Sequence, residues 1–159
     1  MARKYRVVLV DNYDGLRIAL KAVLLDSGSF EVIGEACDGA DLLDLLQKGA
    51  EPDAIVLDLV MPVMTGLEAL DAIRQLHCSA KVLVLTMHKE QELLCRSFKS
   101  GANGYMVKDD IAKELIPALH AVLEGKIYLS ASIMNELIDI CQIKSFAGRV
   151  LPPEFIHCK

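Results

Sequence analysis

The sequence predicts an α/β fold in which one parallel sheet lies between two layers of helices. Short apolar runs rich in Val, Ile and Leu alternate five times with segments whose apolar residues recur at helical spacing. The runs are continuous, as in Val7–Val10 and Ile55–Leu57, which is typical of strands buried on both faces of a parallel sheet. Repeated strand-then-helix units with right-handed crossovers place helices on both faces of that sheet.

Turn and capping residues set the limits of the individual elements. The expected strands are 7–10, 30–36, 55–58, 81–86 and 104–107. The helices that follow them are expected to begin at Asp14, Asp38-Gly39, Thr65, Gln91 and Asp109 or Asp110, and a last helix at Ser130 or Ser132. Glycines that follow the apolar periodicity, namely Gly28, Gly49 and Gly101, are expected to end three of these helices.

Composition limits the possible functions. A chain of 159 residues with 53% hydrophobic and 25% charged residues can bury a sizeable core as a single domain. The formal net charge of -5 argues against a nucleic-acid-binding surface and favours cations as ligands. Five cysteines without a C-x-x-C pair predict reduced thiols, and no apolar segment is long enough for a signal peptide or a membrane span. We therefore expect a cytoplasmic protein without membrane contact.

Polar residues stand directly after four of the five predicted strands. These residues are Asp11, Asn12, Asp58, Thr86 and Lys108. Because the carboxyl ends of parallel strands share one edge of a sheet, we expect these side chains to converge there, where ligands bind in open α/β sheets. A single acid at a strand end is ordinary, whereas an acid, a hydroxyl and an ammonium at separate ends indicate a functional site.

These side chains suit phosphoryl transfer assisted by a metal ion. Carboxylate and amide oxygens are suitable ligands for Mg²⁺, and Asp11, Asn12, Asp58 and the backbone carbonyl of Val60 are the predicted set. In this interpretation Asp58 accepts the phosphoryl group, Lys108 pairs with its oxygens and Thr86 donates a hydrogen bond. The chain has neither G-x-x-x-x-G-K-[ST] nor G-x-G-x-x-G, so the phosphate-binding loops of nucleotide and dinucleotide sites are absent.

An ordered set of motifs resembles the receiver domain of two-component response regulators over about residues 6–130. The motifs are Val8-Leu9-Val10-Asp11-Asn12, Val56-Leu57-Asp58-x-x-Met61-Pro62-x-Met64-x-Gly66, Leu85-Thr86 and Gly101-Ala102-x-Gly104-Tyr105-x-x-Lys108-Asp109. Glu35-Ala36-x-Asp38-Gly39 and Gly125-x-x-Tyr128-Leu129-Ser130 look most like the NarL/FixJ-type branch. The resemblance implies a flavodoxin-like (CheY-like) doubly wound five-stranded sheet with strand order 2-1-3-4-5.

The resemblance also implies a mechanism and a partner. A sensor histidine kinase would donate a phosphoryl group to Asp58, with Mg²⁺ as cofactor. Thr86 would then move toward the phosphate and Tyr105 would turn inward, which changes a partner-binding face. Because the family usually has acids at both positions 11 and 12, Asn12 removes one negative charge and predicts weaker metal binding.

Three classes of function are therefore compared. The first is a phosphorylation-driven signalling switch, favoured by Asp58, Thr86 and Lys108. The second, favoured by Asn12, is a degenerate receiver that binds a partner without phosphorylation. The third, a small phosphatase or hydrolase, lacks a base or nucleophile besides Asp58, so we do not expect an enzyme.

The tail completes the expected organisation. Residues 1–130 are predicted to form the receiver and residues 131–159 an extra C-terminal helix with an irregular tail. Too few residues follow Ser130 for the helix-turn-helix domain of the NarL/FixJ branch, so we expect no DNA-binding output domain and no direct nucleic-acid binding. The apolar face of the last helix would pack on the receiver or in a homodimer.

Overall fold

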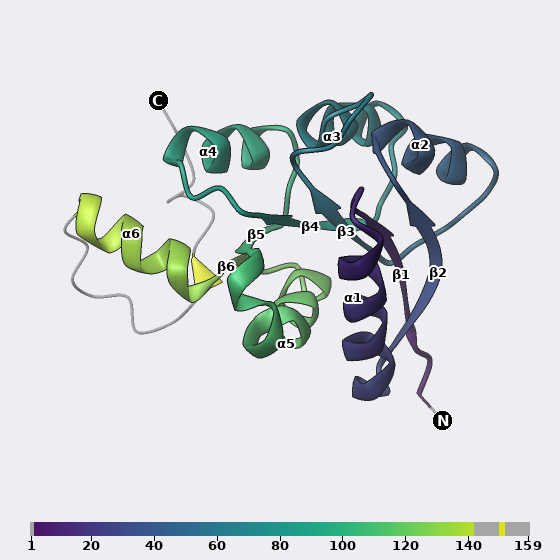
Figure 1. The fold of residues 1–159 in the computed structure, drawn as a ribbon, viewed down its shortest axis with the longest axis horizontal. Helices are drawn as coiled ribbons and strands as arrows, with labels where there is room; N and C mark the ends of the chain where they lie inside the picture. The colour runs from purple at the N-terminus through teal and green to yellow at the C-terminus, as the bar shows by residue number, and fades with distance from the viewer. Residues whose placement is uncertain (1, 142–149, 152–159) are drawn as a thin grey trace.

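Within residues 2–141 and 150–151, which the computed structural model describes, seven strands form one sheet (Figure 1). The strands are β1 (Tyr5–Val10), β2 (Phe30–Ala36), β3 (Ala54–Asp58), β4 (Lys81–Thr86), β5 (Gly104–Val107), β6 (Ile127–Leu129) and β7 (Val150–Leu151). The helices are α1 (Asp14–Ser27), α2 (Gly39–Gln47), α3 (Gly66–Gln75), α4 (Gln91–Lys99), α5 (Ile111–Leu123) and α6 (Ala131–Cys141), and the 3-10 turn η1 (Lys108–Asp110) precedes α5.

The strand order confirms the predicted flavodoxin-like α/β fold. The sheet runs β2-β1-β3-β4-β5-β6-β7, so it contains the expected order 2-1-3-4-5. Two strands extend it beyond the five that we expected: β6 pairs with β5 in parallel, and β7 pairs with β6 in the antiparallel sense. The extra helix α6 follows β6. The irregular tail expected at 146–159 lies outside the described residues except for 150–151, which form β7 instead.

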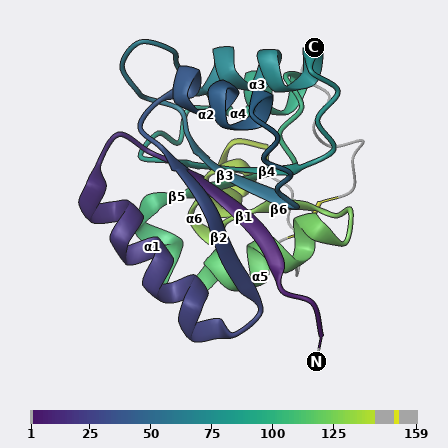
Figure 2. The same ribbon diagram turned by 90° about the vertical axis from the view of Figure 1, so that its right-hand side faces the viewer.

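Helices cover both faces of the sheet. Helices α2, α3 and α4 lie along one face, and α1 and α5 lie along the other (Figure 1 and Figure 2). Successive residues of β1 alternate between the two layers, since Val8 and Val10 pack in the core beneath α2 and α3, whereas Val7 and Leu9 pack beneath α1 and α5. Both sets are buried, which explains why the strand sequences are continuous apolar runs.

Local capping agrees with the sequence at two helices and differs at a third. The side chain of Asp38 accepts a hydrogen bond from the Asp41 amide at the start of α2, and Thr65 with Glu68 forms a reciprocal capping box at the start of α3. Asp14, however, is the first residue of α1 and not its cap, and its carboxylate contacts Arg17 instead.

Carboxylates from η1 and α5, instead of the expected serines, hold the start of α6. The backbone amide of Ala131 donates to Glu114 Oε2 at 3.1 Å, and the hydroxyl of Ser132 donates to Asp110 Oδ1 at 2.9 Å. We expected Asp109 or Asp110 to cap α5. Asp110 stands at the N-cap position, but its side chain makes no capping hydrogen bond to that helix. Ile133 of α6 is buried and belongs to the core on the α2 to α4 side of the sheet, so this helix packs on the rest of the fold.

The cysteines depart in part from the expectation of reduced thiols. Cys37 and Cys78 are free, but Cys95 of α4 is disulfide-bonded. No helix in the described part of the chain is both long and apolar enough to span a bilayer.

Candidate functional site

Three of the predicted site residues meet at the carboxyl edge of the sheet. The Nζ atom of Lys108 lies 2.8 Å from Asp11 Oδ2 and 3.3 Å from Asp58 Oδ2. The side chains of Asp11 and Asp58 are 2% and 5% exposed and that of Lys108 is 18% exposed, so solvent screens this bridge only weakly. The three residues converge because each stands at the end of a strand and because the sheet has the order β1, β3, β4, β5 in this part.

The pKa of Asp58 depends on its burial and on the charges of Lys108 and Asp11. Burial raises the pKa of Asp58 above its ordinary value, the ammonium of Lys108 lowers it, and the charge of Asp11 raises it again. The net effect is a raised pKa, because one ammonium does not offset desolvation together with the second carboxylate. Asp58 Oδ1 also accepts a 3.3 Å hydrogen bond from the Val60 amide, which holds its carboxylate against the loop after β3.

The cluster has the chemistry of a site for a hard cation. Two buried carboxylates face one ammonium, so the cluster keeps a net negative charge, and their oxygens are the ligands that Mg²⁺ prefers. Asn12 and Val60 lie in the exposed loops that directly follow β1 and β3. Among the described residues no group of three or more His, Cys, Asp or Glu side chains could hold a metal ion. A cation at this edge would therefore depend on amide or carbonyl oxygens as well as on the two carboxylates.

Thr86 and Tyr105 are connected through the backbone of His88. The hydroxyl of Thr86 accepts a 3.1 Å hydrogen bond from the His88 amide, and the hydroxyl of Tyr105 donates a 2.9 Å hydrogen bond to the His88 carbonyl. Both Thr86 and Tyr105 are fully buried, so the Tyr105 ring lies inside the protein. Burial first, and the charge of Glu90 second, raise the pKa of Tyr105, while the Thr86 side chain lowers it.

Two contributors were not anticipated from the sequence. The His88 backbone connects Thr86 to Tyr105, a contact between chain segments that no local pattern indicates. Arg17 is buried on α1 and its guanidinium donates to the Asp11 backbone carbonyl. A signal for Arg17 was present, since it stands three residues before Leu20 and seven before Leu24, and therefore lies on the apolar face of its helix.

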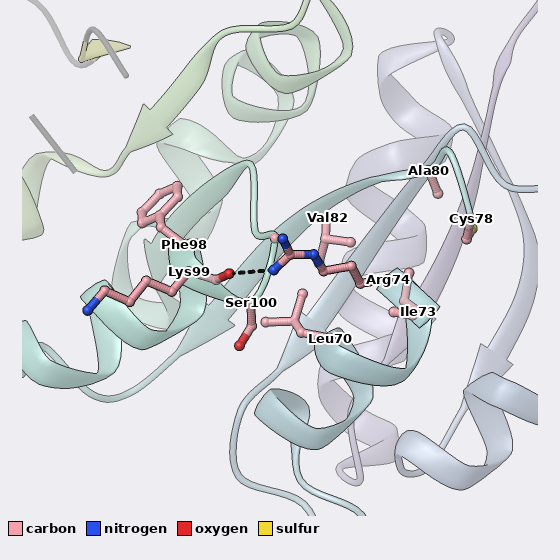
Figure 3. Close-up of a pocket in the computed structure, with 10 residues that line it drawn as sticks. Leu70, Ile73, Arg74, Cys78, Ala80, Val82, Phe98, Lys99 and Ser100 are labelled. Atoms are coloured by element: carbon pink, nitrogen blue, oxygen red, sulfur yellow. Dashed lines mark hydrogen bonds between the residues drawn. The ribbon is translucent and has the colours of Figure 1, made fainter. Parts of the chain in front are cut away.

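A separate cavity of about 280 Å³ lies between α3 and α4, near the start of β4 (Figure 3). Leu70 and Val82 are among its apolar lining residues, and Arg74 Nη1 reaches across to donate a 2.9 Å hydrogen bond to the Lys99 carbonyl. Val82 is the second residue of β4, whereas Thr86 is the last, so this cavity lies at the other end of the strand from the acid cluster.

Comparisons with known proteins agree with this geometry. A family model described as the response regulator receiver domain matches residues 7–120. The nitrate/nitrite response regulator protein NarL of Escherichia coli K12 is 34% identical over 127 residues, which cover 80% of this chain and 58% of NarL. The transcriptional regulatory protein DegU of Brevibacillus brevis is 33% identical over 135 residues, which cover 85% of this chain and 57% of DegU. The chain thus spans a little over half the length of these relatives.

Solved structures give the same result. A two-component response regulator of the LuxR family from Aurantimonas has a TM-score of 0.82 and 30% identity, with coverage of 88% of this chain and 99% of that one. A DNA-binding response regulator of the LuxR family from Staphylococcus aureus has a TM-score of 0.70 and 27% identity, with coverage of 75% and 98%.

The descriptions of these relatives contradict one of the expectations about binding partners. A sensor kinase is consistent with the matches. The expectation of no direct nucleic-acid binding is contradicted, because the relatives are transcriptional regulators and a solved neighbour is DNA-binding. The acidic charge of the present 159 residues describes only the part that corresponds to the receiver. It therefore does not report on the nucleic-acid partners of such regulators.

Proposed function

The chain belongs to the response regulator receiver domain family, and we propose that it is the phospho-acceptor receiver of a two-component system. In this proposal a sensor histidine kinase phosphorylates Asp58, and the product changes a partner-binding face. The receiver comprises residues 1–130, followed by a C-terminal appendage over 131–159, and the role is signalling and not enzymatic turnover.

The bridge from Asp11 through Lys108 to Asp58 is the observation that carries this proposal. Asp58 is held at the end of β3 with one carboxylate oxygen toward the Val60 amide and the other toward the lysine. An Asp58 oxygen would form a bond to phosphorus as the bond between phosphorus and the histidine nitrogen of the kinase breaks. The ammonium of Lys108 would then pair with the negatively charged phosphoryl oxygens.

The remaining predicted residues supply the metal ligands and the response. Asp11, Asn12, Asp58 and the Val60 carbonyl would hold Mg²⁺, which neutralises charge on the phosphoryl oxygens when it is bound. The Thr86 hydroxyl would donate a hydrogen bond to a phosphoryl oxygen, and the His88 backbone would pass this change to Tyr105. The expected result is a shift of population between two arrangements of the loop after β4.

One specific observation favours a second candidate, a receiver that binds its partner without phosphorylation. Asn12 lacks the negative charge of the acid that the family usually has at this position, which weakens the attraction for a divalent cation.

A phosphorylation assay distinguishes the two candidates. The protein is incubated with a small phosphodonor such as acetyl phosphate, with Mg²⁺ or with a chelator, and its intact mass is measured. We expect the mass of one phosphoryl group with Mg²⁺ and none with the chelator. Asp58→Asn should abolish the gain, whereas Asp71→Asn, at an exposed aspartate of α3, should not. An unchanged mass of the parent protein in Mg²⁺ would favour the receiver that acts without phosphorylation.

A further inference from the structure

Arg17 is a buried cation outside the set of residues discussed so far for phosphoryl transfer. Its Nη1 donates to the backbone carbonyl of Asp11, its Nη2 to the carboxylate of Asp14, and its Nε to Glu35 Oε1 at 3.3 Å. The guanidinium thus joins the loop after β1 to β2, and its side chain is only 11% exposed. A planar fork of donors suits three acceptors in different directions, which a lysine ammonium on its flexible stem would match less well.

The contact with Arg17 completes the fixation of Asp11. The Asp11 amide donates to the Ala36 carbonyl at 3.1 Å, Oδ1 accepts from the Tyr13 amide at 2.8 Å, and Oδ2 accepts from Lys108 at 2.8 Å. The carbonyl that Arg17 holds belongs to the peptide group between Asp11 and Asn12. Because a peptide group is planar, the direction of this carbonyl also sets the direction in which the chain enters Asn12.

The charges around Arg17 balance, so this group of side chains adds no net charge near Asp11. Arg17 and Lys21 are positive, and their partners Asp14 and Glu35 are negative. An unpaired guanidinium this close to Asp11 would repel a second cation, whereas the balanced set acts mainly through geometry.

We propose that Arg17 is a positioning residue for the cation end of this site, which holds the peptide between Asp11 and Asn12 so that both residues are presented together. This inference rests on the proposed function. It has particular weight in this chain because Asn12 contributes a neutral amide, and a neutral ligand contributes through its placement and not through long-range attraction. Residues that orient metal ligands typically change metal affinity tenfold to a hundredfold when they are removed.

The test measures Mg²⁺ binding directly, by calorimetric titration with MgCl₂, in the parent protein and in two variants. Arg17→Met keeps the length of the side chain and removes all donors, and we expect it to weaken Mg²⁺ binding by about tenfold. Arg17→Lys keeps the charge but not the fork, and we expect an intermediate loss. The backbone amide signal of Asn12 in NMR spectra without metal should shift or split in Arg17→Met.

A matched control separates positioning from general destabilisation. Leu24→Ala creates a cavity under the same helix, at a fully buried residue far from the loop, and should lower thermal stability without changing Mg²⁺ affinity. If Arg17→Met does not fold, the comparison between Arg17→Lys and Leu24→Ala decides the question. Unchanged Mg²⁺ affinity in the folded Arg17 variants, or no Mg²⁺ binding by the parent protein, would overturn the inference.

A kinetic readout keeps this inference distinct from the proposed function. With acetyl phosphate, Arg17→Met should raise the Mg²⁺ concentration for half-maximal phosphorylation while the maximal rate stays close to that of the parent. If the parent protein takes no phosphoryl group but the Arg17 variants lose Mg²⁺ affinity, the proposed function fails and the positioning role stands. If phosphorylation occurs with the same Mg²⁺ dependence in all variants, the function stands and the positioning role fails.

Discussion

The ammonium of Lys108 lies 3.3 Å from a carboxylate oxygen of Asp58, at the carboxyl ends of two strands that are not neighbours in the sheet. Strand β4 lies between them, so the long lysine side chain spans the width of one strand to reach the acid. The same ammonium binds Asp11, and it is the group that lets two carboxylates be buried side by side.

Replacement of Lys108 by methionine should therefore destabilise the protein. Two buried carboxylates would lose their shared partner, and the pKa of Asp58 would rise further because Lys108 lowers it. We expect a loss of about 3 kcal/mol in the free energy of unfolding near neutral pH, measured by urea denaturation. Lys113→Met, at an exposed lysine of α5, serves as the control and should change stability little. Equal stability of the two variants would show that the bridge is energetically unimportant.

Replacement of Asp58 by asparagine should have the opposite effect in the absence of metal. The pKa of Asp58 is raised in the folded state, so the folded protein binds a proton more tightly than the unfolded chain does. The stability that comes from the protonated Asp58 side chain is present at low pH and is lost as pH rises through its raised pKa. Asp58→Asn should thus be more stable than the parent near neutral pH, by roughly 1 kcal/mol, and the advantage should vanish below the ordinary aspartate pKa. Urea midpoints across that range test the sign, and a parent protein that gains stability with rising pH there would refute it.

Replacement of Asn12 by aspartate should be favourable when Mg²⁺ is bound and unfavourable to stability when it is not. The added carboxylate attracts a divalent cation, and a unit-charge pair at about 4 Å in an effective dielectric of about 20 is worth roughly 4 kcal/mol before desolvation. Even a partial effect should tighten Mg²⁺ binding about tenfold and speed phosphorylation of Asp58. Without metal, the new charge beside Asp11 should lower the melting temperature. Asn135→Asp, at an exposed asparagine of α6, should show neither effect.

Replacement of Gly66 by alanine should disturb the loop that carries Asp58. A Cβ atom at this position would lie 2.2 Å from the Asp58 carbonyl oxygen and 2.7 Å from the Leu59 Cα, and both belong to the backbone. We expect a loss of about 3 kcal/mol and slower phosphorylation, since the strand end must move. Gly15→Ala is the matched control, because the three atoms nearest to a Cβ there all belong to the exposed side chain of Tyr13 and not to the backbone. Denaturant unfolding of the two variants provides the measurement, and equal losses would contradict this account.

The fold and the acid cluster were predictable for a simple physical reason. Strands β3, β4 and β5 and the last four residues of β1 are buried on both faces, so their sequences are continuous apolar runs. The polar residue at the end of each run marks the edge of the sheet. Asp11, Asp58 and Lys108 each mark that edge, and the common direction of parallel strands brings them together. The roles assigned to them, and to Asn12, Thr86, Tyr105 and Val60, stay predictions until phosphorylation is measured.

The parts that could not be predicted depend on contacts between distant segments. Strand β6 has only three residues, too few to show a period, and it forms because β5 offers an unpaired edge. The start of α6 is held by Glu114 and Asp110, although Ser130 and Ser132 are the residues that local preference favours. Glu114 is an acid on the buried face of α5, and that position was the available sign that it has a partner.

The pairing of β6 with β5 bears on how Tyr105 can move. Strand β5 is not at the edge of the sheet: its Tyr105 pairs with Val84 on one side, and the Tyr105 carbonyl accepts a 3.1 Å hydrogen bond from Ser130 on the other. Amide hydrogens of β5 should therefore exchange with solvent only in openings as costly as those of the central strands. A change at Tyr105 must then occur by rotation of its ring on a fixed backbone. It can begin by breaking one hydrogen bond to the His88 carbonyl, without separation of the strands.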